Sequence, residues 1–183
     1  MYKDILKDSK ENNKVIGLTL YGEDGFWSGI VKNYNEEIIM LQHYTKYGQP
    51  DGLLVESIEN IESIDFNNEY SESMEYIILN SDKLNQDFSN IDISSKIENW
   101  PIDAIKEAKG NTNIILSIQI NKDEIYYGFV EDINETNIKL KLIDQLGKVH
   151  KMSIFKIEDI STVKFNCLSS RRRLLLYQRK YNL

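Results

Sequence analysis

Two stretches decide the fold, GIVKNYNEEIIML at residues 29–41 and GFVEDINETNIKL at residues 128–140. Each contains a glycine, an apolar run, an Asn-Glu pair and a second apolar run, and the two lie 99 residues apart. This pattern predicts two strands joined by a tight turn. A glycine inside a strand marks a bulge or the close approach of another segment. We therefore expect a sharp bend at Gly29 and at Gly128.

The match extends along almost the whole chain. A shift of 99 positions aligns the chain with itself without a gap, pairing for example Ile16 with Ile115 and Gly48 with Gly147. Identity is roughly one position in five, whereas chance gives roughly one in fifteen, and this self-similarity indicates a tandem duplication. The predicted division is repeat one at 1–84, a polar linker at 85–99 and repeat two at 100–183.

Each repeat is expected to hold a short amphipathic helix, five strands and a further helix. Repeat one should have strands at 15–20, 26–31, 37–44, 53–55 and 61–66 and a helix at 73–79; repeat two should have strands at 114–120, 125–133, 137–143, 149–155 and 160–165 and a helix at 169–179. Five short strands cannot bury a face as a flat sheet, so we expect each set to curl into a small barrel without exposed edges. The fold class is mainly β with flanking helices (α+β).

This order of elements, with a glycine in the second strand, resembles the Sm-like (LSm) fold. The two opening stretches resemble the first Sm motif, and IENIESI at 58–64 and IEDISTV at 157–163 stand where the second would be. The segment YGQPDGLLVESIENIESIDFNNEY also looks like small bacterial Sm-like proteins of unknown role. The resemblance implies two tandem Sm-like five-stranded bent β-barrels, each preceded by a short helix and followed by another.

The chain departs from the RNA-binding members of that family. Those members usually have an asparagine at the start of strand three and an arginine-glycine pair in the second motif. Here the places hold Ile39 and Ile138, then Glu59-Asn60 and Glu158-Asp159. Carboxylates repel a phosphate backbone, so RNA binding is disfavoured. Asn35 and Asn134 match the family's loop position and are candidate binding residues, although turn formation also explains them.

Composition indicates a cytoplasmic protein outside the membrane. The chain is 28% charged, and no apolar run approaches the roughly 20 residues that span a bilayer. Its start has no apolar signal core, and Cys167 is the only cysteine. Residues 1–99 hold 8 lysines, no arginine and 19 acidic residues, about −11, whereas residues 100–183 hold 14 basic and 10 acidic residues, about +4. An acidic half is thus joined to a mildly basic one.

Sequence motifs for catalysis are missing. The chain has no GxxxxGK[ST], GxGxxG, HExxH or CxxC pattern. His43 and His150 do not occupy equivalent repeat positions, and Cys167 aligns with Asn68. Since acid–base and metal chemistry need converging partners, we expect no enzyme activity, no cofactor and no metal.

A basic run near the end of the chain is the sharpest local feature. Arg171, Arg172 and Arg173, followed by Arg179 and Lys180, lie in the last expected helix. One interpretation is a solvated helix, paired to the acidic half of the molecule. The other is a site for an anion or an acidic partner, because arginine binds carboxylate and phosphate with two hydrogen bonds. We expect the three arginines to be mostly exposed, with the neighbouring leucines, Leu175 and Leu176, packed against the sheet.

Two functions follow as expectations. The first is a non-catalytic protein-interaction module, such as an immunity or inhibitor protein that acts on a basic partner. The alternative is an Sm-like RNA- or nucleotide-binding protein that uses the basic second repeat. The barrel edges also offer a route to oligomers.

Overall fold

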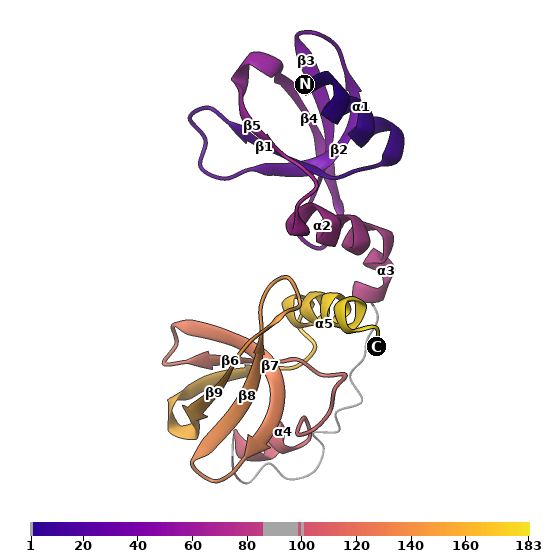
Figure 1. Cartoon of the computed structure of the whole chain (residues 1–183). Coiled ribbons are helices and arrows are strands. Elements are labelled where there is room, and N and C mark those ends of the chain that lie inside the picture. Colours follow the sequence, from indigo (N-terminus) through magenta and orange to yellow (C-terminus); the bar gives the residue numbers. More distant parts are fainter. Residues whose placement is uncertain (1, 86–98, 100) are drawn as a thin grey trace. The chain divides into compact units, whose positions relative to one another are not determined.

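The computed structural model describes residues 2–85, 99 and 101–183. The chain forms two compact units, residues 1–82 and residues 83–183 (Figure 1). The expected linker at 85–99 falls almost entirely outside the described residues.

The first unit is an antiparallel sheet with helices at both ends of its sequence. Its elements are α1 (Tyr2–Asn12), β1 (Ile16–Leu20), β2 (Trp27–Tyr34), β3 (Ile38–Tyr44), β4 (Pro50–Ser57), the 3-10 turn η1 (Ile58–Asn60), β5 (Ile61–Asp65) and α2 (Glu69–Leu79). A short helix, α3 (Ser81–Leu84), spans the boundary between the units. The strand order is β4-β3-β2-β1-β5. β4 is longer than expected, because Pro50 needs no ladder donor when it begins an edge strand.

The second unit has the same order of strands. Its elements are α4 (Ile102–Lys106), β6 (Leu116–Ile120), β7 (Glu124–Ile133), β8 (Asn137–Ile143), β9 (Val149–Lys156), the 3-10 turn η2 (Ile157–Asp159), β10 (Ile160–Lys164) and α5 (Leu168–Tyr181). Read from the strand equivalent to β4, the order is β9-β8-β7-β6-β10. The mainly β fold with flanking helices is therefore as expected, and both final helices are longer than the sequence pattern predicted.

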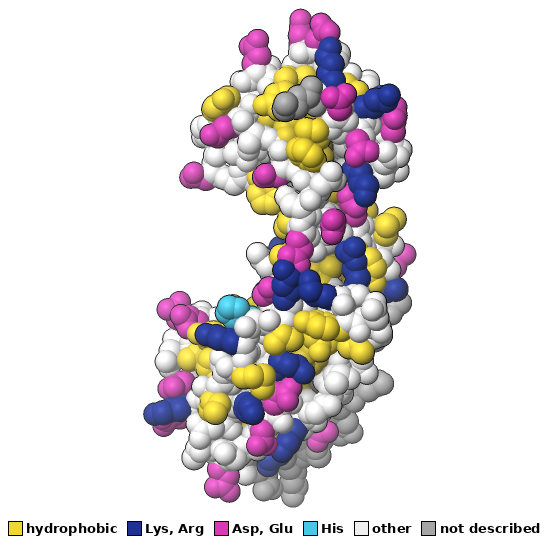
Figure 2. Space-filling model, viewed as in Figure 1, with side chains coloured by type: hydrophobic (Ala, Val, Ile, Leu, Met, Phe, Trp, Pro, Cys, Tyr) yellow, Lys and Arg dark blue, Asp and Glu magenta, His cyan; other side chains and the backbone are white. Residues whose placement is uncertain are grey.

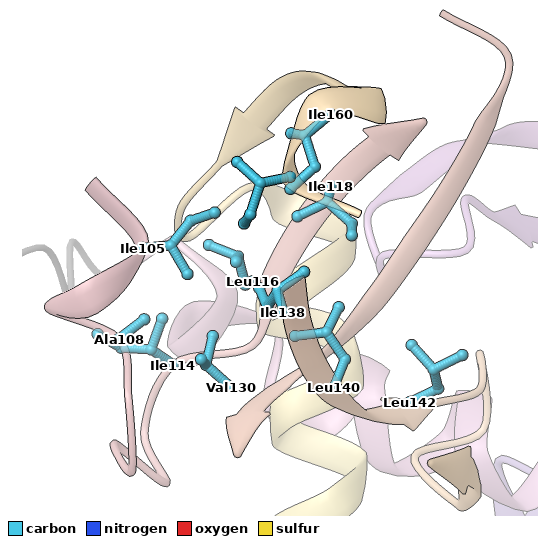
Figure 3. Packing of buried hydrophobic residues seen from close by; sticks show 11 residues of the cluster. Ile105, Ala108, Ile114, Leu116, Ile118, Val130, Ile138, Leu140, Leu142 and Ile160 are labelled. Carbon is cyan, nitrogen blue, oxygen red and sulfur yellow. The ribbon is translucent and has the colours of Figure 1, made fainter. Parts of the chain in front are cut away.

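The expected barrels are wrong, because both sheets are open. β4 and β5 stay at opposite edges of one sheet, and β9 and β10 at opposite edges of the other. The helices make closure unnecessary. Leu6 of α1 is buried in the apolar face of the first sheet, and Ile105 of α4 is buried in that of the second. Figure 3 shows Ile105 among the apolar side chains of the second sheet. A covered face has no need to curl on itself, and the edge strands are left open.

The first strands of the two units correspond at an offset of 100 residues, not 99. Ser28 pairs with Gly17 in the first unit, and Tyr127 pairs with Ser117 in the second. The gapless alignment of Ile16 with Ile115 is therefore wrong. Successive side chains of a strand point to opposite faces, so a slip of one residue exchanges the faces. Ile16 lies in the core under α1, whereas Ile115 packs with Leu174 of α5 on the other face.

The second strands keep the offset of 99. Gly29 pairs with His43, and Gly128 pairs with Leu142. A β-carbon at Gly29 would lie 2.2 Å from the Gln42 carbonyl oxygen, and at Gly128 the corresponding distance to Lys141 is 2.6 Å. The close approach of strand three therefore requires both glycines. The irregularity in pairing lies a little further on, between Val31 and Asn33 in the first unit, and not at the glycine itself.

The final helix of each unit is seated on the turn between strands three and four. A β-carbon at Gly48 would lie 3.0 Å from the Ile77 carbonyl oxygen of α2, and one at Gly147 would lie 2.5 Å from the Tyr177 nitrogen of α5. Both glycines also have positive φ angles, +75° in each case. The turn glycine thus sets how closely the helix can pack in both units.

Candidate binding surfaces

The arginines of α5 mostly hold the helix on its own sheet. Arg172 is only 5% exposed, and its Nη1 donates a hydrogen bond to the Gln145 carbonyl oxygen in the turn between β8 and β9. Arg173 is half-buried; its Nε donates to the Ile143 oxygen at 3.3 Å, and its guanidinium carbon lies 3.8 Å from the centre of the Tyr127 ring. Stacking of this kind adds to the hydrogen bonds.

The expectation that all three arginines are mostly exposed is therefore wrong. Arg172 is buried and Arg171 is half-buried, because the carbonyl groups of the hairpin turn need donors that a guanidinium can supply from the helix. Leu175 and Leu176 are buried, as expected. Arg179 and Lys180 are exposed in the last turn of α5, where positive charge is favourable next to the helix C-terminus.

The two candidate asparagines build their turns. The Asn35 side-chain oxygen accepts from the Glu37 and Ile38 nitrogens at 2.8 and 2.7 Å. The Asn134 oxygen does the same for Thr136 and Asn137, at 2.9 and 2.8 Å. Turn chemistry thus accounts for the hydrogen bonds of both side-chain oxygens.

These turns lie against the 3-10 turns that follow strand four. The Ile58 nitrogen donates to the Glu37 oxygen at 2.8 Å, and the Ile157 nitrogen donates to the Thr136 oxygen at 2.9 Å. The turn after strand two and the turn after strand four therefore meet in each unit. We call the carboxylates gathered there the first acidic end (Glu36, Glu37, Glu56 and Glu59) and the second acidic end (Glu135, Glu158 and Asp159).

Lysines neutralise part of each acidic end. Lys3 donates to Glu36 at 2.8 Å, and this hydrogen bond lowers the pKa of the Glu36 carboxyl. Lys156 lies 3.1 Å from Glu158, and that hydrogen bond raises the pKa of Lys156. Exposed pairs of this kind contribute little to stability. Figure 2 shows acidic side chains spread over the surface of the first unit.

The open edges carry exposed apolar side chains that the sequence analysis did not single out. On β4, Leu53 and Val55 are 56% and 55% exposed. On β9, Met152 and Ile154 are 46% and 67% exposed. The two pairs occupy equivalent positions in the two units. Their recurrence at an offset of 99 was a signal available in the sequence, but its meaning depends on whether the edge is open.

His43 and Cys167 contact neighbouring side chains and backbone within their own units. His43 Nδ1 lies 2.9 Å from the Ser28 carbonyl oxygen, so this nitrogen carries the hydrogen. Its Nε2 is 3.8 Å from an Asp51 oxygen, and its ring packs edge-on against Trp27. Cys167 contacts Ser170 at the start of α5, at 3.2 Å.

Within residues 2–85, 99 and 101–183, no three His, Cys, Asp or Glu side chains gather closely enough to hold a metal ion. None of the helices formed by these residues combines the length and the apolarity that crossing a membrane requires.

Comparisons with known protein families, with curated proteins and with solved structures found no match to this chain.

Proposed function

We propose that this chain is a non-catalytic protein-interaction module whose acidic first unit binds a basic protein. The charge of that unit carries the proposal: residues 1–82 contain 6 lysines, no arginine and 16 acidic residues, about −10. A surface of one sign attracts partners of the other and speeds their encounter. Inhibition of a basic enzyme, such as a nuclease, is one role that this charge would suit.

The first acidic end is the proposed contact. Glu37 and Glu59 are exposed there on two segments that a backbone hydrogen bond holds together. A rigid pair of loops loses little conformational freedom on binding, which favours affinity. The α5 arginines support protein binding over RNA binding by the second unit, because Arg172 and Arg173 donate to backbone carbonyl oxygens of their own unit.

We also propose that the two units arose by duplication of one Sm-like ancestor. The shared strand order supports this, as do the equivalent roles of the glycines in strand two and in the turn before strand four. The offset of 100 in the first strand is consistent with one residue gained before that strand and one lost after it.

The test is affinity capture with the full chain from its native cell, followed by a binding titration with the purified protein that is captured. The Glu37→Lys/Glu59→Lys variant should lose a basic partner, and higher salt should weaken binding to the wild type. The matched control, Glu11→Lys/Asp24→Lys, makes the same charge change at exposed positions of α1 and the β1–β2 loop and should keep binding. A partner retained equally by both variants would contradict the proposed contact.

RNA is tested separately, by titrating uridine-rich and adenine-rich oligonucleotides near 150 mM salt, where phosphate contacts show their salt dependence. Weak or absent binding is expected. Submicromolar, salt-sensitive binding would favour the RNA-binding alternative instead.

A further inference from the structure

β4 and β9 are edge strands of the two sheets. β4 pairs with β3 and β9 pairs with β8, and no other strand among the described residues pairs with either. Each therefore presents a row of backbone N–H and C=O groups along its outer edge. Edge strands of monomeric proteins commonly carry charged side chains or proline to prevent such pairing. Here the proline of β4 stands only at its first residue, Pro50.

The exposed faces of these strands are apolar at their centres. Leu53 and Val55 on β4, and Met152 and Ile154 on β9, are each close to half or more exposed. An open edge with an apolar centre is a typical site for adding another strand.

The charges around the apolar centres have opposite signs on the two strands. β4 contains Asp51 and Glu56 and no basic residue. β9 contains Lys151 and Lys156, with His150, and no acidic residue. Complementary charge favours one pairing and opposes others.

We propose that β4 of one copy of this chain pairs antiparallel with β9 of a second copy. One register satisfies both the apolar and the charged positions. With Leu53 opposite Ile154, Val55 falls opposite Met152. Asp51 and Gly52 fall outside this register, because the pairing of β4 with β3 is irregular there and Gly52 has a φ of +84°.

The same register also matches the inner faces of the strands. Glu56 falls opposite Lys151. By alternation Glu56 shares the face of β4 that carries Leu54, and Lys151 shares the face of β9 that carries Phe155, and both of these apolar residues pack on their own cores. Side chains alternate between faces with a period of two, so residues on the outer face of β4 meet only residues on the outer face of β9.

Pairing of like strands is less favourable. Two copies of β4 would bring two acidic strands together. Two copies of β9 in the register that aligns Met152 with Ile154 would set His150 opposite Lys156. Because β4 and β9 are different surfaces of one chain, the contact is head-to-tail. It does not depend on the basic partner proposed for the first acidic end.

The first experiment blocks each edge in the full chain. Leu53→Lys/Val55→Lys replaces the apolar centre of β4 with positive charge, close to the lysines of β9, and Met152→Glu/Ile154→Glu replaces that of β9 with negative charge, close to the acids of β4. Leu79→Lys is the control, because Leu79 is an exposed apolar residue at the end of α2. Sedimentation velocity is recorded from about 10 to about 500 µM, the range in which a weak interface becomes populated.

The wild type and the Leu79→Lys control should associate as concentration rises, and each blocked variant alone should stay monomeric. A mixture of the two blocked variants should associate, since one supplies an intact β9 and the other an intact β4. A monomeric wild type across the range would overturn the proposal. Self-association of the β9-blocked variant would point to β4–β4 pairing and also overturn it, as would self-association of the β4-blocked variant through β9.

A charge exchange tests the register at Glu56 and Lys151, which lie in the regularly paired parts of β4 and β9; Lys151 is exposed and Glu56 is half-buried. Glu56→Lys and Lys151→Glu should each weaken association by about tenfold, and the two together in one chain should restore it. A double variant as weak as the single ones would show that these residues are not opposite each other.

Discussion

Replacing Ser9 by alanine removes a hydroxyl group that connects α1 to the first sheet. Ser9 is fully buried, its hydroxyl donates to the Lys14 oxygen at 2.6 Å, and it accepts from the Val31 nitrogen at 3.1 Å. Val31 stands at the irregularity where β2 loses its regular pairing with β3. The hydroxyl therefore satisfies two backbone groups, and one of them is a buried N–H.

The expected loss follows from leaving those groups without a partner. The buried Val31 N–H left unsatisfied costs about 1–3 kcal/mol and the half-buried Lys14 carbonyl about 1 kcal/mol, so Ser9→Ala should destabilise the first unit by about 2–4 kcal/mol. Native-state hydrogen exchange of the β1 and β2 amides should then accelerate by roughly 30-fold to several hundred-fold. The β6 and β7 amides serve as an internal reference, because they belong to the second unit and Ser9 belongs to the first.

Ser63→Ala is the control variant, since Ser63 is exposed on β5 and its replacement should change stability by less than about 0.5 kcal/mol. If the β2 amides of the Ser9→Ala variant exchange within a factor of about two of the wild type, the hydroxyl does not stabilise the helix–sheet contact and the reasoning is refuted.

Two further predictions concern the contact between α5 and its hairpin. Gly147→Ala should destabilise the second unit by more than about 3 kcal/mol, because the new methyl would overlap the Tyr177 nitrogen; Gly52→Ala, also at positive φ but in open space, should cost only about 1 kcal/mol. In urea unfolding, equal shifts of each affected unit's midpoint from its wild-type value would contradict the packing argument. Arg172→Ala should cost about 1.5–3 kcal/mol, because it leaves the Gln145 oxygen without its charged donor, and a thermal unfolding midpoint unchanged from that of Arg179→Ala would count against it.

Local patterns in the sequence were sufficient to predict most of the elements. Alternating apolar residues and turn residues placed the ten strands found among the described residues, because these signals act over a few neighbouring positions. The need for glycine at Gly29 and Gly128 was also visible, since only a missing side chain permits such close strands. The turn role of Asn35 followed from its own short side chain.

Only the tertiary structure decided three features: the burial of Arg172, the sheet face to which the residues of the first strand point, and the open sheet edges. Arg172 lies among charged residues that the local sequence pattern predicts to be exposed. A hairpin turn 27 residues away in the sequence nevertheless supplies the acceptor for its hydrogen bond. Ile115 and Ile16 are the same residue type at aligned positions, but a slip of one residue sends them to opposite faces of their sheets. Whether Leu53 and Ile154 are buried or exposed depends on whether the sheet closes into a barrel. The helices that pack over the apolar faces decide this closure, and the strands themselves do not.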